Sequence, residues 1–124
     1  MADTLDQLRD RLREFADERD WGQFHTVKNL AMAVAGEAGE LVAELQWHTD
    51  DEIVAQLHRD SELSGRLSDE VADVLIYVVR LADVCGIDLL AAAERKIELN
   101  EARYPVHLAR GRASKYDELR SHQR

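Results

Sequence analysis

Apolar side chains recur every three or four positions along most of this chain, which is the period of an amphipathic helix. The first run consists of Leu5, Leu8, Leu12 and Phe15. Thr4 precedes this run, and Gln7 follows Thr4 with the spacing of a helix-capping box. A second run consists of Leu30, Val34, Leu41 and Leu45. The pattern therefore predicts helices over about residues 5–19 and 27–46, with Thr26 capping the second.

The middle of the chain continues the pattern. Thr49 and Glu52 again have capping-box spacing and predict a short helix, followed by a polar connection over residues 61–65. Residues 67–85 form the most apolar stretch and predict a long helix that ends at Gly86. The inner face of this helix would consist of Val74, Val78, Leu81 and Cys85.

Asp88 can cap a last helix, which Pro105 would stop near Tyr104. The chain contains only six Gly and one Pro, and 45% of its residues are hydrophobic. This composition is typical of helices joined by short connections. We therefore predict one all-α domain over residues 1–105, built as a compact four- to five-helix bundle. The basic segment 106–124 is expected to be an extended or mobile C-terminal tail.

Net charge and cysteine usage limit the possible partners. The formal charge of −9 argues against binding to a nucleic acid polymer, because such polyanions need a basic surface. No stretch approaches the roughly 20 apolar residues that span a membrane. Cys85 is the only cysteine, so an intramolecular disulfide is impossible and a reducing, cytoplasmic location fits best. We expect Cys85 to pack in the core.

Two pairs of acidic residues stand one helical turn apart where apolar residues would be expected. Glu37 and Glu40 form the first pair, and Glu70 and Asp73 form the second. Desolvation and mutual repulsion would make four such carboxylates costly. Exposure, protonation or arginine partners could offset this cost in a purely structural role. Acid pairs on facing helices are also the way in which a helical bundle builds a metal site.

Oxygen ligands favour a hard cation, so Mg²⁺ is the expected ion, with Mn²⁺ as a possible substitute. A di-iron centre would need a histidine three residues after a glutamate, and none of the five histidines has that spacing. An ion of this kind usually shares its coordination sphere with water and phosphate oxygens. The acid pairs therefore indicate phosphoryl chemistry.

Two other stretches carry candidate binding residues. Trp21 and His25 flank Gly22 in a break between helices, where they could either plug the end of the bundle or form a pocket wall that stacks on a base. On the last predicted helix, Lys96 and Asn100 share one face with Arg103. This face could be a solvated helix end or a set of donors for phosphate.

The two acid pairs, Glu37-x-x-Glu40 and Glu70-x-x-Asp73, resemble the motif of the all-α nucleoside triphosphate pyrophosphatases, the MazG-like superfamily. Several further stretches are similar to its dCTP pyrophosphatase branch: residues 18–25, 36–47, 73–77, 103–105 and 114–116. The resemblance implies Mg²⁺-dependent cleavage between the α- and β-phosphates in a homotetrameric helical assembly.

The resemblance also implies a role for each candidate residue. The metal ligands and catalytic residues would be Glu37, Glu40, Glu70 and Asp73. The nucleoside would lie against Trp21, His25, Asn29, Trp47 and Tyr77. The phosphates would be held by Lys96 and Asn100, with Arg103 or Tyr104. Lys115 and Tyr116 suggest that the tail closes over the substrate.

Three functions remain open from the sequence. The first is a pyrophosphatase that acts on dCTP or 5-modified dCTP and sanitises the nucleotide pool. The second is a related pyrophosphatase for dUTP or another non-canonical nucleotide. The third is a non-enzymatic helical interaction module whose acids form salt bridges.

Overall fold

The computed structural model describes residues 1–58 and 61–121, and within these ranges the chain is all-α, as predicted. Seven helices lie in the described residues: α1 (Leu5–Glu18), α2 (Val27–Leu45), α3 (Asp50–Leu57), α4 (Glu62–Cys85), α5 (Leu89–Arg103), α6 (Val106–Ala109) and α7 (Tyr116–Ser121). They divide into two compact units, Met1–Ile87 and Asp88–Arg124. No described helix is long and apolar enough to cross a membrane.

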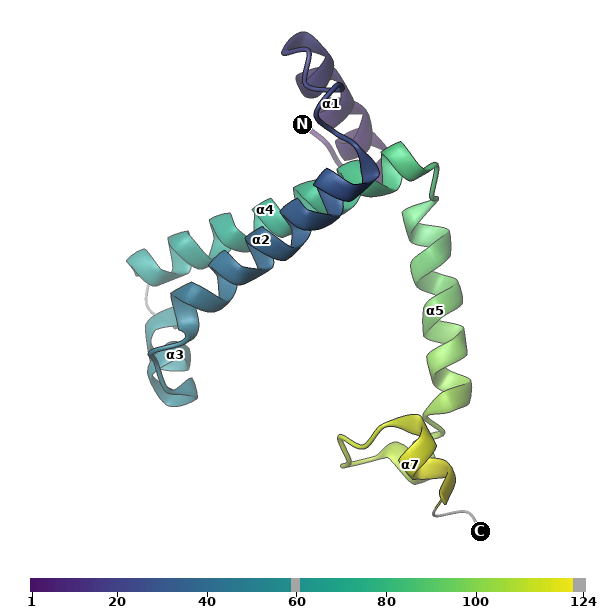
Figure 1. Ribbon diagram of the computed structural model, residues 1–124. Helices are drawn as coiled ribbons and strands as arrows, with labels where there is room; N and C mark the ends of the chain where they lie inside the picture. The colour runs from purple at the N-terminus through teal and green to yellow at the C-terminus, as the bar shows by residue number, and fades with distance from the viewer. Residues whose placement is uncertain (59–60, 122–124) are drawn as a thin grey trace. The chain divides into compact units, whose positions relative to one another are not determined.

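The first unit is organised around α2 and α4, which lie side by side in opposite directions (Figure 1). Helices α1 and α3 pack against α4. The buried apolar side chains of this unit are Ala16, Leu30, Leu63, Val79 and Ala82. They come from α1, α2 and α4, so burial of apolar area fixes these helices against one another.

Local capping sets where these helices begin and end, and the predicted caps are confirmed. The side-chain oxygens of Thr4, Thr26 and Asp88 each accept a hydrogen bond from a backbone N–H in the first turn of the following helix. Thr49 and Glu52 form a reciprocal capping box. Gly86 ends α4 with φ of 68°, a left-handed conformation that glycine adopts without steric cost.

Two expectations about α4 are wrong. The helix begins at Glu62 instead of following a polar connection, because the Ser61 hydroxyl accepts a hydrogen bond from the Ser64 backbone N–H. Leu63 is then placed in the core, where it is 1% exposed. Cys85, in the last turn of the helix, is exposed in the isolated chain, contrary to the expected core position.

The second unit contains α5 and the short helices α6 and α7. Where the sequence suggests an extended tail, the chain forms these two helices, and α7 buries Leu119. The ring of Tyr116 packs edge-to-face against Tyr104 at 6.4 Å, and the Arg103 guanidinium lies 4.7 Å from the same ring. The domain boundary at residue 105 stays a prediction.

Candidate functional site

Three of the four predicted metal ligands converge. Glu37 of α2 and Glu70 and Asp73 of α4 each offer a carboxylate oxygen, and these oxygens lie within 4.8 Å of one another. We call these three residues the acid group. They come together because α2 and α4 run in opposite directions and present their acid-bearing turns at the same level. None of the three side chains is buried, so a ligand could reach them from solvent.

The acid group carries an excess of negative charge. The pKa of Glu70 is raised above its ordinary value, first by desolvation and then by repulsion from Asp73, Glu37, Glu40 and Glu44. A bound cation would reverse this effect, because it would favour the charged carboxylate. The site is therefore electrostatically suited to a divalent ion.

Glu40, the fourth predicted ligand, lies outside the three converging oxygens, although its charge reaches Glu70. Glu44, one turn further along α2, accepts a hydrogen bond from Arg66 Nε at 2.9 Å. Arg66 stands one turn before Glu70 on α4. This ion pair between Arg66 and Glu44 is a structural salt bridge. Among the described residues, the acid group itself has no arginine partner.

Two of the predicted nucleoside contacts, Trp21 and His25, lie just before the N-terminal end of α2. We call residues 20–25 the aromatic loop; it connects α1 to the cap of α2. The Trp21 ring packs edge-to-face against Phe15 at 5.6 Å and against His25 at 6.3 Å. Asn29 donates its side-chain N–H to the Phe24 carbonyl at 3.0 Å, which ties the loop to the first turn of α2. At 1.5 Å per residue, about 15 Å of helix separates the start of α2 from Glu37.

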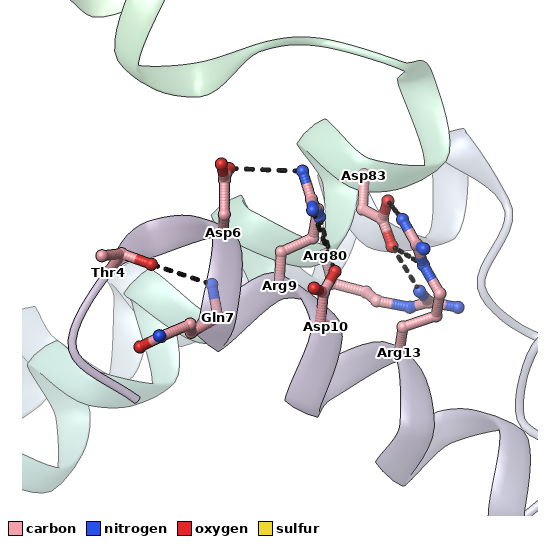
Figure 2. A network of polar contacts seen from close by, with 8 residues as sticks. All are labelled: Thr4, Asp6, Gln7, Arg9, Asp10, Arg13, Arg80 and Asp83. Carbon is pink, nitrogen blue, oxygen red and sulfur yellow. Dashed lines mark hydrogen bonds and ion pairs between the residues drawn. The ribbon is translucent and has the colours of Figure 1, made fainter. Parts of the chain in front are cut away.

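A polar network joins this loop to α4 and α1, and Figure 2 shows the part of it formed by Arg13, Arg80 and Asp83. Arg80 donates its Nε–H to Nδ1 of His25 at 3.0 Å and an Nη1–H to Asp83 at 3.0 Å. Arg13 of α1 donates to both oxygens of the same carboxylate. We call Arg13, His25, Arg80 and Asp83 the arginine network. The pKa of His25 is lowered by burial and by the Arg80 charge, so the imidazole is neutral at pH 7.

The other predicted nucleoside contacts are spread over this unit. Trp47 follows the end of α2 and is 85% exposed. Tyr77 lies on α4 one turn after Asp73 and is half-buried. The structure thus brings Trp21 together with His25 and places Tyr77 beside the acid group along α4. It leaves the Trp47 side chain largely exposed in the isolated chain.

The predicted phosphate-binding residues belong to the second unit. Lys96 and Asn100 share a face of α5, and Lys96 is exposed. Arg103 and Tyr104 both contact the Tyr116 ring, so their side chains are part of the packing of this unit. The roles of all four toward phosphate stay predictions.

Sequence reasoning missed the arginine network. Arg80 and Asp83 stand three residues apart on α4, a spacing that places them on one face of the helix. Two oppositely charged residues at this spacing within the apolar stretch 67–85 could have indicated a buried ion pair. Their contacts with His25 and Arg13 depend on the packing of three segments, which the sequence does not reveal.

Residues 33–119 match the MazG-like family. The chain is 47% identical over 116 residues to dCTP pyrophosphatase 1 of Rattus norvegicus and of Homo sapiens, and these alignments cover 94% of this chain and 68% of each relative. The chain belongs to the MazG-like family. The crystal structure of a pyrophosphatase from Archaeoglobus fulgidus is 42% identical, has a TM-score of 0.75, and is matched over 85% of this chain and 95% of that one.

The MazG-like match includes both acid pairs and all of α4 and α5. The alignment with the two curated relatives extends further toward the N-terminus, because it covers 94% of the chain and so includes the aromatic loop. The resemblance stated from the motifs is confirmed at the level of the family. In this chain, the acid group lies on the central antiparallel helices α2 and α4.

Proposed function

We propose that this chain is a Mg²⁺-dependent pyrophosphatase that cleaves dCTP or a 5-modified dCTP between the α- and β-phosphates. The products would be the nucleoside monophosphate and pyrophosphate. The observation that carries the proposal is the convergence of Glu37, Glu70 and Asp73 within a MazG-like chain that is 47% identical to dCTP pyrophosphatase 1. Oxygen ligands and an adjoining phosphate fit a hard divalent ion.

The chemistry of the acid group supports Mg²⁺ over softer ions. Its three candidate ligands are carboxylates, and the raised pKa of Glu70 marks a place where a cation relieves repulsion. Glu40 stands one turn from Glu37. It would either be a fourth ligand of the metal ion or act as the general base that accepts a proton from the attacking water. When bound, Mg²⁺ would offset the charge of the phosphates and polarise the phosphoryl oxygens.

The remaining residues would bind and orient the nucleotide. Trp21 offers an aromatic face to the base, and Asn29 keeps the aromatic loop attached to α2. Lys96 and Asn100 would donate hydrogen bonds to phosphate oxygens, where charge-assisted bonds are strongest. Trp47 and Tyr77 would contact the nucleoside. Arg103 and Tyr104, at the end of α5, would help to bind the phosphates.

A panel of nucleoside triphosphates at equal concentration, with both products identified, tests this function. We expect dCTP to give dCMP and pyrophosphate only when Mg²⁺ is present. Glu40→Gln and Asp73→Asn should each abolish turnover while the helical circular dichroism spectrum is unchanged. Wild-type turnover in either variant would contradict the assignment of the site.

The same panel separates the other candidate functions. Preference for dUTP or a damaged nucleotide would indicate a related pyrophosphatase with a different base specificity. Absence of turnover with every nucleotide would favour a helical interaction module.

A homotetramer is proposed as the active assembly. Several large apolar side chains on the central helix pair are exposed in the isolated chain: Met32, Val42, Val71 and Leu75. Exposed apolar side chains on neighbouring helices are typical of surfaces that associate. Light scattering coupled to size-exclusion chromatography would measure the mass directly. The cytoplasmic location stays a prediction from the single cysteine.

A further inference from the structure

The arginine network contains more positive charge than an ordinary structural ion pair needs. Two guanidinium groups, from Arg13 and Arg80, share the single carboxylate of Asp83. Arg80 is only 8% exposed, and burial of a charged side chain is costly unless it is fully paired. One arginine would suffice to neutralise Asp83. Arg80 is the guanidinium of this network that lies beside His25.

This arrangement determines where the proton of His25 lies. Arginine has no acceptor atom and stays protonated, so the Nε–H of Arg80 must donate to a lone pair on Nδ1 of His25. The only proton of the neutral imidazole must then be on Nε2. The adjoining guanidinium also disfavours a second proton, in agreement with the lowered pKa of His25. The ring is held as one tautomer.

The Nε2–H group remains free for a ligand. Among the described residues, the imidazole bonds only to Arg80, and no buried side-chain nitrogen or oxygen there lacks a partner. Nε2 of this half-buried residue is consequently in contact with solvent. The backbone N–H of His25 donates to the carbonyls of Trp21 and Gly22, and the Trp21 ring packs against the imidazole. The imidazole is thus held beside the Trp21 ring.

We propose that Arg80 is a positioning residue for nucleotide recognition: by donating to Nδ1, it holds His25 in the Nε2–H tautomer, which donates a hydrogen bond to an acceptor atom of the nucleobase. This inference rests on the proposed function. It extends that function because it assigns a role in base recognition to a buried residue of α4 that would not itself touch the substrate. Cytosine offers such acceptors in its carbonyl oxygen and its unprotonated ring nitrogen.

The first test measures the tautomer without any nucleotide. Two-bond ¹H–¹⁵N correlation spectra of the full chain at neutral pH report the protonation of each imidazole nitrogen, and His25→Phe assigns the His25 signals. We expect the pure Nε2–H tautomer in the wild type and a mixture of tautomers in Arg80→Met. A proton on Nδ1 of the wild-type protein, or an unchanged tautomer in Arg80→Met, would overturn the proposal.

The second test measures steady-state kinetics with dCTP. A fall of the Nε2–H population to between about one half and one tenth predicts that Arg80→Met raises KM by roughly two- to tenfold, with kcat nearly unchanged. Arg13→Met is the matched control, because it removes the other guanidinium of the network but leaves the bond from Arg80 to His25. It should preserve both the tautomer and KM. Equal increases of KM in the two variants would show a general structural effect and overturn the proposal.

A double-mutant cycle separates positioning from an independent role. In the His25→Phe background, Arg80→Met should have no further effect on KM, because the imidazole through which it acts is gone. Additive effects would contradict the inference. If the wild type hydrolyses no nucleotide, the proposed function fails and the base-recognition role fails with it, while the spectra still decide whether Arg80 fixes the tautomer. If the wild type hydrolyses dCTP and Arg80→Met leaves KM unchanged, only the further inference fails.

Discussion

Glu37 on α2 and Glu70 on α4 each place a carboxylate oxygen within 4.8 Å of the other and of Asp73. The antiparallel alignment of the two helices produces this proximity. The same alignment pairs Glu44 with Arg66 toward one end of the helices and His25 with Arg80 toward the other. The position of the acid group therefore depends on the register between α2 and α4.

Glu70→Gln should raise the melting temperature of the metal-free protein. Because the folded state raises the pKa of Glu70, the charged carboxylate opposes folding in the absence of a cation. The contribution of this group to stability accordingly falls as pH rises through its folded pKa. In the variant, this pH dependence should diminish. Differential scanning calorimetry of chelator-treated protein at several pH values would measure both effects.

The same substitution should weaken the response to metal. Mg²⁺ binding to the folded state stabilises the wild type by mass action, and loss of one carboxylate ligand should reduce the affinity about tenfold or more. Glu62→Gln is a matched control, because Glu62 is an exposed glutamate at the start of the same helix, outside the acid group. Isothermal titration with Mg²⁺ would compare the three proteins. Equal affinity in wild type and Glu70→Gln would contradict the metal assignment.

Asp83→Asn should destabilise the fold by about 2 kcal/mol, the scale of a hydrogen bond to a charged group. Hydrogen bonding to Arg13 lowers the pKa of Asp83, so its stabilising contribution is present above the unfolded-state pKa and is lost as pH falls through the folded-state pKa. The difference between wild type and variant should therefore shrink under acidic conditions. Asp10→Asn, which alters an exposed pair with Arg9, should cost less than about 1 kcal/mol. Urea unfolding at neutral and acidic pH would measure these differences.

Leu30→Ala should cost about 3 kcal/mol of unfolding free energy, because Leu30 is 1% exposed and its truncation leaves a cavity beside α4. The same substitution at Leu57, which is 41% exposed on α3, should cost much less. Equal losses would indicate that α2 is not the central packing element. Chemical unfolding followed by circular dichroism gives both values.

Leu75→Glu should lower the oligomeric mass. Leu75 is 43% exposed on α4 in the isolated chain, and a buried interface would exclude a new carboxylate there. Asp69→Glu, an exposed change on the same helix that keeps its charge, should leave the mass unchanged. Size-exclusion chromatography with light scattering would separate the two outcomes. A tetramer unaffected by Leu75→Glu would place the association surface elsewhere.

Most helix boundaries could be read from the sequence because their causes are local. The caps at Thr4, Thr26 and Asp88 depend on residues within one turn. The start of α4 differs from the prediction because residues 61–65 are mostly polar and contain a glycine, which is typical of a connection. The Ser61 hydroxyl nevertheless caps a helix that begins at Glu62. The burial of Leu63 stabilises this longer helix, and burial is a tertiary effect.

The sequence by itself determined the all-α fold, the family and the two acid pairs, because helical period and motif spacing are properties of neighbouring residues. Only the tertiary structure decided which carboxylates converge: it selected Glu37, Glu70 and Asp73 and left Glu40 outside their common set. It also decided that Arg80 reaches His25. Both outcomes follow from the register of α2 against α4, which the packing of buried apolar side chains such as Leu30 and Val79 establishes.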